Sequence, residues 1–200
     1  MQPHSSEYRT LQADSQAVFR EKMSRFLAFA HPVTSAKEAR EWVAAVANKY
    51  HDARHVCWAY MLGADSSEFQ WNDNGEPSGT AGKPILGQMM SKNVTNLIIA
   101  VVRYFGGIKL GTSGLIAAYR EAARLAIEAG TIVTAYEMAN VSFTFPYIAM
   151  NSVMRTIRDS GASIVTQQFD NTCFITLAIR ADQACDLAKK IAAIDGTSIQ

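Results

Sequence analysis

The chain has few of the features that mark secreted or membrane-spanning proteins. Its 200 residues include three cysteines, Cys57, Cys173 and Cys185, and no C-x-x-C pair. An odd number of cysteines argues against a disulfide-stabilised secreted scaffold and favours a reducing compartment. No stretch approaches the roughly 20 apolar residues that cross a bilayer, and the first residues lack a basic region followed by an apolar run. We therefore expect a cytoplasmic protein with no membrane partner.

An excess of charge of one sign is also missing. Nineteen basic side chains face eighteen acidic ones, so the chain lacks the overall basic field that drives nonspecific nucleic-acid binding. Any such binding has to be local. No proline- or glycine-rich linker and no low-complexity run interrupts the sequence. With 48% hydrophobic residues, the chain can bury one sizeable core or two small ones.

What the chain does have is a glycine-rich turn between an apolar run and an amphipathic segment. Glycines let the backbone adopt conformations closed to other residues and let its N–H groups approach a ligand. The glycines of this turn are Gly106, Gly107, Gly111 and Gly114. Thr112 or Ser113 is expected to cap the following helix, whose start carries about half a positive charge, and Arg103 and Lys109 add two full charges. The turn predicts phosphate or carboxylate binding, with a purely structural strand-to-helix connection as the alternative.

A second loop combines turn residues with two carboxylates and a lysine ahead of another apolar helix. Its carboxylates, Asp73 and Glu76, could hold a divalent cation or act as acid and base if the protein is an enzyme, with Lys109 holding the substrate. The structural alternative, which we favour, is that Asp73 forms a turn and that Glu76 caps a helix or pairs with Lys83.

The backbone of this second loop offers donors of its own. Gly79 and Thr80 precede the expected helix, so two loops of this kind facing each other would make an anion-binding cleft. Arg103 comes near the end of the apolar run 95–105, and α/β sheets place their ligands beyond the strand ends. We therefore expect the two loops to converge.

Two histidines and a cysteine near residue 55 are candidates for metal binding or nucleophilic catalysis. His51 and His55 are four residues apart, but the residues between them predict a turn into a strand, so we expect no metal pair. His55 and Cys57 share one face of the expected strand, which would suit a Cys–His nucleophile. Because Cys57 has bulky apolar neighbours, we expect a small buried thiol instead. The sequence predicts no metal site and no cofactor.

Hydrophobic periodicity divides the chain at residue 135 and indicates an α+β fold. In the first domain, residues 1–135, strands and helices are expected to alternate. The expected strands are 7–20, 25–31, 55–62 and 95–105, and the expected helices start at the capping box Ser35-x-x-Glu38, at residue 84 and at Ser113. In the second domain, residues 136–200, the order is β-α-β-β-α with room for a short final strand, which is the order of a ferredoxin-like sandwich.

Three motifs together resemble the signatures of one family. The second loop contains Gly75-Glu76-Pro77-x-Gly79-Thr80-Ala81-Gly82-x-Pro84, and the glycine-rich turn contains Arg103-Tyr-Phe-Gly-Gly-x-x-Leu-Gly111. Upstream stands Asp52-Ala53-Arg54-His55-x-Cys57. These segments resemble the IMPACT/YigZ family, in its bacterial two-domain form, over most of the first 130 residues. The family usually has two adjacent aspartates before Gly-Glu-Pro, whereas the second is Asn74 here.

The resemblance implies more about the fold than periodicity does. It implies that the first domain shares the α/β fold of the second domain of a small-subunit ribosomal protein, which is also found in elongation factor G and in small-molecule kinases. It also implies that the second domain resembles a ferredoxin-like module of elongation factor G.

Three classes of function follow from these observations. The family resemblance favours a non-enzymatic RNA- or ribosome-associated protein in translation or its regulation, with the glycine-rich loops and Arg54, Lys83, Arg103 and Lys109 contacting phosphates. The alternative is an enzyme acting on a small phosphorylated or carboxylated metabolite or nucleotide in the same cleft. A protein-interaction module that uses the sheet of the small domain has less support, and the sequence names no protein partner.

Overall fold

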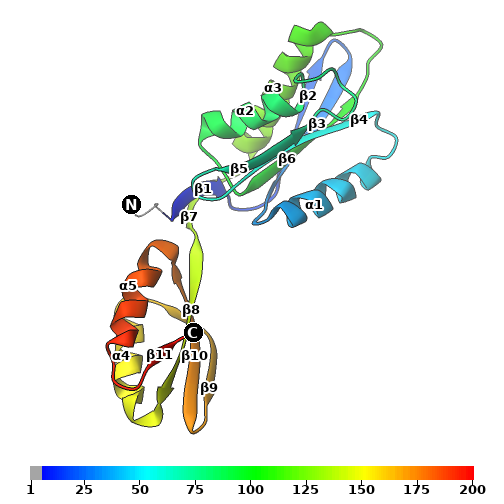
Figure 1. The fold of residues 1–200 in the computed structure, drawn as a ribbon. Coiled ribbons are helices and arrows are strands. Elements are labelled where there is room, and N and C mark those ends of the chain that lie inside the picture. Colours follow the sequence, from blue (N-terminus) through cyan, green and yellow to red (C-terminus); the bar gives the residue numbers. More distant parts are fainter. Residues whose placement is uncertain (1–5) are drawn as a thin grey trace. The chain divides into compact units, whose positions relative to one another are not determined.

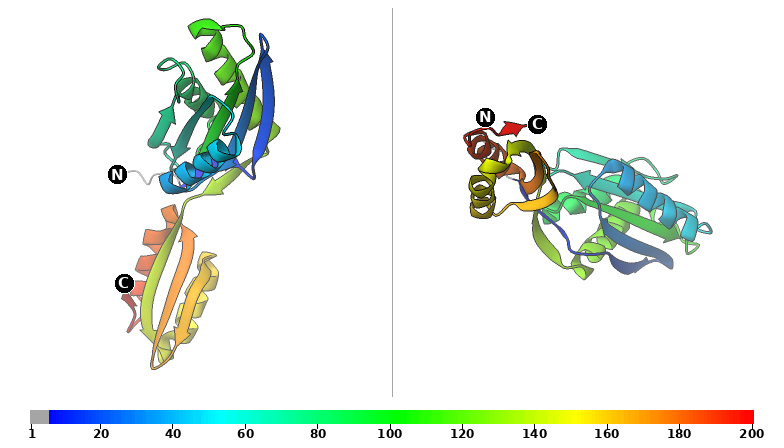
Figure 2. Two further views of the ribbon diagram at one scale, coloured as in Figure 1. Left: turned by 90° about the vertical axis from the view of Figure 1, so that its right-hand side faces the viewer. Right: turned by 90° about the horizontal axis from the view of Figure 1, so that it is seen from below.

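The computed structural model describes residues 6–200 and shows two compact units (Figures 1 and 2). The larger unit is Tyr8–Ala135. The smaller unit joins Tyr136–Gln200 with Ser6 and Glu7. The chain therefore passes from one unit to the other twice. The predicted first domain, residues 1–135, included Ser6 and Glu7 and also residues 1–5, which lie outside the described residues.

The larger unit is built on a five-stranded sheet. Its elements are β1 (Glu7–Leu11), β2 (Ser15–Glu21), β3 (Ser24–Pro32), α1 (Ala36–Lys49), β4 (His55–Leu62), β5 (Glu68–Asn72), α2 (Gly82–Lys92), β6 (Leu97–Tyr104), α3 (Gly111–Ala129) and β7 (Ile132–Tyr136). The sheet order is β2-β3-β6-β4-β5, and β1 pairs separately with β7. All neighbours in the five-stranded sheet run antiparallel.

Helices cover both faces of this sheet, so its central strand is buried on both sides. Helices α2 and α3 pack on one face and α1 packs on the other (Figure 1). Strand β6 lies in the middle, and its unbroken apolar run from Leu97 to Val102 is fully buried. This agrees with the prediction of a central strand. The position of β6 matters for function, because Arg103 follows that run and is carried to the end of the sheet.

The order of elements in the larger unit corrects the predicted alternation of strands and helices. Three strands precede α1, and two strands, β4 and β5, separate α1 from α2. Strand β5 is not among the strands expected from the sequence. The predicted alternation depends on runs of adjacent apolar residues. Strand β5, whose five residues are all exposed, contains no such run.

The capping box predicted for α1 is present with one difference. Ser35 is the N-cap, and its hydroxyl accepts a hydrogen bond from the backbone N–H of Glu38 at 3.2 Å. The Glu38 carboxylate accepts from the N–H of Thr34, one residue before the cap, at 2.7 Å. These bonds lower the pKa of Glu38, with the Thr34 N–H as the largest cause. Side-chain caps therefore set the start of α1.

The smaller unit has the predicted order, with the short final strand present. Its elements are β8 (Met138–Pro146), η1 (Tyr147–Ala149), α4 (Met150–Ser160), β9 (Ser163–Phe169), β10 (Thr172–Arg180), α5 (Ala181–Ala192) and β11 (Ser198–Ile199). The sheet order is β11-β8-β10-β9, with antiparallel neighbours. Both helices pack on one face over a core that includes Phe143, Ile175 and Leu187 (Figure 2). Gly161 ends α4 at φ = 70°, a left-handed conformation that favours glycine.

None of the helices within residues 6–200 is long and apolar enough to cross a lipid bilayer.

Candidate functional site

A buried ion pair lies at the end of β6. Arg103 Nη1 donates to Glu76 Oε1 at 2.6 Å, and the two side chains are only 8% and 4% exposed. The hydroxyl of Tyr119, on α3, donates to the same carboxylate oxygen at 2.8 Å. Glu76 therefore pairs with Arg103 and not with Lys83. The pair joins the loop before α2 to the strand before α3.

Asp73 holds the second loop in shape. Its carboxylate accepts backbone hydrogen bonds from Gly79 at 2.8 Å, from Ala81 at 2.9 Å and from Gly82 at 2.8 Å. The last two of these donors lie at the start of α2, so Asp73 caps that helix from nine residues upstream. This agrees with the structural interpretation of Asp73, because the carboxylate is engaged in the fold. It also corrects the expectation that Gly79 offers its N–H to a ligand.

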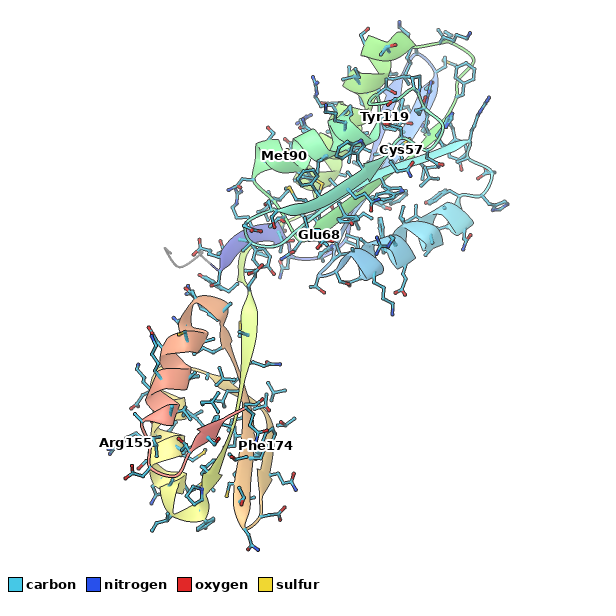
Figure 3. The ribbon with its side chains drawn as sticks, in the orientation of Figure 1. Cys57, Glu68, Met90, Tyr119, Arg155 and Phe174 are labelled. Atoms are coloured by element: carbon cyan, nitrogen blue, oxygen red, sulfur yellow. The ribbon has the colours of Figure 1, made fainter. Side chains whose placement is uncertain are left out.

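The hydrogen-bond network continues from Tyr119 to Cys57. The Cys57 sulfur lies 3.3 Å from the Tyr119 hydroxyl and 3.0 Å from the carbonyl oxygen of Asp73. Both side chains are labelled in Figure 3, where they approach each other between α3 and the sheet. Burial raises the pKa of the Cys57 thiol to about 12, and burial also raises the pKa of Tyr119. A buried neutral thiol is a poor nucleophile, which agrees with the expected structural role.

His55 is held by a different partner. Its Nδ1 lies 2.8 Å from the carbonyl oxygen of Asn74, and a carbonyl can only accept, so Nδ1 carries the proton. Asn74 itself has φ = 39°, in the left-handed region that asparagine tolerates better than most residues. The replacement of the usual second aspartate therefore falls on a turn position, and the carboxylate that holds the loop is retained.

A pocket of about 410 Å³ opens beside the ion pair. Its lining residues are Arg54, His55, Glu76, Pro77, Arg103, Phe105, Lys109, Leu110, Gly111, Thr112 and Leu115. They come from the start of β4, the loop before α2, the end of β6 and the start of α3. The two loops singled out from the sequence therefore meet at one concave surface. Six of the predicted site residues lie there: Arg54, Glu76, Arg103, Lys109, Gly111 and Thr112.

The other predicted site residues lie elsewhere in the larger unit. Gly79 and Lys83 line a separate depression with Arg120. Thr80 is buried, and its hydroxyl donates to the carbonyl of Pro77 at 2.6 Å. The Asp73 carboxylate accepts from the backbone N–H groups at the start of α2. The loop before α2 thus contributes Glu76 and Pro77 to the pocket, while its backbone donors at Gly79 serve the fold.

Some glycines of the glycine-rich turn likewise serve the fold. A Cβ atom on Gly106 would come within 2.1 Å of the Met23 backbone, and the Gly106 N–H points to the Ser24 hydroxyl at 3.3 Å. Gly106 therefore serves the packing of the turn against the β2–β3 hairpin, as the structural alternative held. Gly107 and Gly111 have φ values of 88° and 72° and need glycine for conformation.

The start of α3 corrects the predicted cap. Leu110 is the N-cap, without a side-chain hydrogen bond in the described part of the chain, so neither Thr112 nor Ser113 caps this helix. The reason is that α3 begins at Gly111, two residues earlier than the sequence suggests. Both hydroxyl residues thus fall inside the first turn and are exposed. Thr112 lines the pocket, and Ser113 lies outside it.

Arg103 has one donor that the fold does not satisfy. Within residues 6–200, its Nε is the buried side-chain nitrogen or oxygen without a hydrogen-bond partner. Native proteins pair nearly all such groups, because an unpaired buried donor costs roughly 1–3 kcal/mol. Arg103 also lines the pocket.

A larger depression of about 630 Å³ lies between α1 and strands β2 and β3. Its walls include Phe29, Trp42 and Tyr50, and its charged residues are Asp14 and Lys49. Trp42 is partly exposed here and stacks on His31 with ring centroids 5.1 Å apart. We assign the candidate site to the smaller pocket, because three cationic side chains and the unpaired Arg103 donor meet there.

Sequence reasoning missed several residues of the site. Phe105, Leu110 and Leu115 form its apolar side, and the Tyr119 hydroxyl donates a hydrogen bond to Glu76. The signal for Tyr119 was available: a tyrosine in the buried stripe of a helix needs a partner for its hydroxyl. The position of Phe105 had no such signal, because it depends on how the chain leaves β6.

Comparison with known proteins places the pocket inside a recognised domain. The family model "Impact N-terminal domain" matches residues 22–127. The chain is 30% identical over 181 residues to "IMPACT family member YigZ" of Escherichia coli (strain K12), a match that covers 90% of this chain and 89% of the relative. It is 32% identical over 169 residues to an "IMPACT family member" of Haemophilus influenzae, with 82% of each chain covered. A crystal structure of a hypothetical protein superposes with a TM-score of 0.75 at 28% identity, covering 97% of this chain and 96% of that one.

Proposed function

This chain belongs to the IMPACT family, and from that membership and the pocket we propose that it is a non-enzymatic RNA- or ribosome-associated protein with a role in translation or its regulation. One observation carries the proposal. Arg54, just before β4, and Arg103 and Lys109, in the segment from Arg103 to Gly111, line one pocket at the start of a helix. Such a cluster supplies local phosphate affinity in a chain whose overall charge is close to neutral. The proposed site residues are the six predicted ones among the residues that line this pocket.

The proposal includes finer assignments of fold and location. We infer that the larger unit is related to the second domain of a small-subunit ribosomal protein and to the corresponding domain of elongation factor G. We infer that the smaller unit, with its βαββαβ order, is a ferredoxin-like module. A role in translation places the protein in the cytoplasm.

The test is RNA binding or ribosome co-sedimentation at several salt concentrations. Arg54→Ala with Lys109→Ala removes two exposed cations from the pocket without touching the buried ion pair. If both contact phosphates of single-stranded RNA, the slope of log K against log salt should become shallower by about 1.4. Arg103→Ala is a poor variant for this purpose, because it strands the buried charge of Glu76.

A matched control is available on the same unit. Lys83→Ala with Arg120→Ala removes the same charge from the neighbouring depression and should leave the slope unchanged. Absence of RNA and ribosome binding at low salt would contradict the proposal. An equal loss of affinity in the control pair would contradict the assignment to this pocket.

The second candidate is an enzyme acting on a small phosphorylated or carboxylated metabolite or nucleotide. The observation that favours it is the carboxylate of Glu76 on the wall of an anion-attracting pocket. Glu76 receives hydrogen bonds from Arg103 and Tyr119, and Asp73 is engaged as a helix cap. This candidate predicts turnover of a phosphorylated compound in a metabolite screen, abolished by Glu76→Gln. A screen that finds binding without turnover would count against it.

A further inference from the structure

The start of α3 offers backbone donors to a ligand. The first N–H groups of any helix lack partners within the helix. In α2 the Asp73 carboxylate accepts from the N–H groups of Ala81 and Gly82, whereas the N-cap of the 19-residue α3, Leu110, makes no side-chain cap bond and the first turn of α3 holds no acidic residue. Gly111 and Thr112, which open α3, line the pocket. The donors of α3 and their partial positive charge therefore face a place where a ligand can enter.

The buried side chain of Arg103 points to a ligand independently of the helix. More than nine-tenths of this side chain is buried, Nη1 is bound to Glu76, and Nε has no partner. A guanidinium presents its donors as a rigid planar fork that matches the oxygens of phosphate. An anion in the pocket would supply the acceptor that the fold leaves out.

The charge around the pocket matches a doubly charged group. The charge of Glu76 balances that of Arg103, so Arg54 and Lys109 remain together with the helix start, a sum of roughly +2.5. A terminal phosphomonoester carries about −1.5 to −2 at neutral pH, whereas an internal phosphodiester carries one charge. An internal phosphodiester also has chain on both sides, which a depression of about 410 Å³ accommodates less well than a chain end. The site therefore fits a terminal phosphate.

The apolar side of the pocket indicates that the ligand carries an apolar group in addition to a phosphate. Leu110, Leu115 and Phe105 line it, and the Phe105 ring is 54% exposed. The guanidinium carbon of Arg103 lies 5.7 Å from the centroid of that ring. Exposed aromatic rings beside cations are the surfaces on which nucleic-acid bases stack. The ligand should thus carry a flat ring next to its phosphate.

We propose that this pocket binds a single nucleotide with a terminal phosphate, either free or at the 5′ end of an RNA strand. The phosphate lies between the start of α3, Lys109 and Arg103, and the base stacks on Phe105. This inference rests on the proposed function, since it names the group that the phosphate-binding pocket takes.

The experiment uses the full chain with three probes: AMP, and one short single-stranded RNA with either a 5′-phosphate or a 5′-hydroxyl. We expect the phosphorylated RNA to bind at least tenfold more tightly than the hydroxyl form. Arg54→Ala with Lys109→Ala should remove that difference. Phe105→Ala should weaken AMP and phosphorylated RNA by about tenfold, while Phe69→Ala, a change at another exposed aromatic ring, should not.

The outcomes separate this inference from the proposed function. AMP that competes fully with the phosphorylated RNA identifies the free nucleotide as a sufficient ligand, and weak competition identifies the RNA end. Equal binding of the two RNAs, weakened in both by the Arg54 and Lys109 changes, would overturn the inference and leave the proposed function standing. Binding of inorganic phosphate as tight as AMP would overturn the nucleotide assignment. No binding of any probe would overturn the inference, and ribosome co-sedimentation then decides the proposed function separately.

Discussion

At the scale of single residues, the pocket depends on a buried chain of polar groups. Cys57, Tyr119, Glu76 and Arg103 follow one another in hydrogen-bond distance, from the face of β4 to the end of β6. Buried polar groups of this kind stabilise a fold when each is paired and destabilise it when one partner is lost. The network therefore fixes the carboxylate and the guanidinium in place before any ligand arrives.

The raised pKa values of Cys57 and Tyr119 predict a loss of stability in alkali. In the unfolded chain these groups ionise near 9.0 and 10.0, whereas burial raises the pKa of Cys57 to about 12 and raises that of Tyr119 as well. Above pH 9 the unfolded state therefore binds fewer protons than the folded state. The free energy of unfolding should fall as the pH rises, by up to about 1.4 kcal/mol per pH unit for each group.

Urea denaturation between pH 8 and pH 11 measures this slope. Tyr119→Phe removes one of the two titrating groups, so its slope above pH 10 should be shallower, although its stability at pH 8 will be lower through loss of the bond to Glu76. Tyr147→Phe, at a residue that is 70% exposed, is the control and should behave as the unmodified protein. Identical slopes for all three proteins would contradict the prediction.

The residue scale also shows what sequence reasoning can reach. The small buried thiol of Cys57 followed from its apolar neighbours, and the charges of Arg103 and Lys109 pointed to a turn that lines the pocket. The partner of Glu76 did not follow, because 27 residues separate Glu76 from Arg103 and only the fold brings them together. Long-range pairs of this kind leave no periodic signal in the sequence.

At the scale of elements, the two helices beside the pocket begin in opposite ways. The Asp73 carboxylate accepts from the N–H groups of Ala81 and Gly82 at the start of α2, whereas the N-cap of α3, Leu110, makes no side-chain cap bond. An acidic group at a helix start compensates the partial charge of the unpaired N–H groups. The unpaired N–H groups are therefore bonded by a side chain of the protein in α2, whereas those of α3 are available to a ligand.

The cap of α2 can be tested by substitution. Asp73→Ala removes the acceptor of three backbone N–H groups and should lower the free energy of unfolding by about 2 kcal/mol. Asp73→Asn keeps one oxygen and should cost about 1 kcal/mol. Thermal or urea unfolding measures both. Asn74→Asp, which restores the usual second aspartate, is the control and should shift stability by less than about 0.5 kcal/mol. A larger loss at position 74 than at position 73 would refute this account.

Element positions followed from the sequence wherever the hydrophobic pattern was strong. Strand β4 was predicted with its observed bounds, 55–62, and the buried strand β6 lies within the predicted 95–105. Strand β5 was missed because its side chains are all exposed, and the start of α3 was misplaced because Leu110 serves as N-cap without a polar side chain. Tertiary packing determines such elements, and a local pattern does not reveal it.

At the scale of the whole molecule, the chain divides into two units with separate cores. The smaller unit buries its own apolar cluster, which includes Phe143, Ile175 and Leu177. Ser6 contributes two hydrogen bonds to this unit. Its hydroxyl donates to Asp182 at 2.8 Å, and its carbonyl accepts from the N–H of Glu137 at 2.8 Å. The larger unit contains the pocket and the segment that matches the family model.

Residues 136–200 expressed alone should fold. We expect a cooperative thermal transition by far-UV circular dichroism, because the core cluster lies within this fragment. The midpoint should be lower than in the full chain, since the fragment lacks the two Ser6 hydrogen bonds and domains of about 60 residues are marginally stable. Leu177→Ala in the fragment should abolish the transition, at a cost of about 2–5 kcal/mol. A fragment without cooperative unfolding would show that this unit needs the rest of the chain.

The pairing of β1 with β7 has a consequence for how this module can be used. Gln12 donates to Thr131 at 2.9 Å, so the strand that enters the larger unit and the strand that leaves it run side by side. A segment whose two ends are neighbours can be excised and replaced by a short bridge, or grafted into a surface loop of an unrelated host, without straining either partner. The larger unit can therefore be inserted into another protein as one piece, and the pocket would go with it.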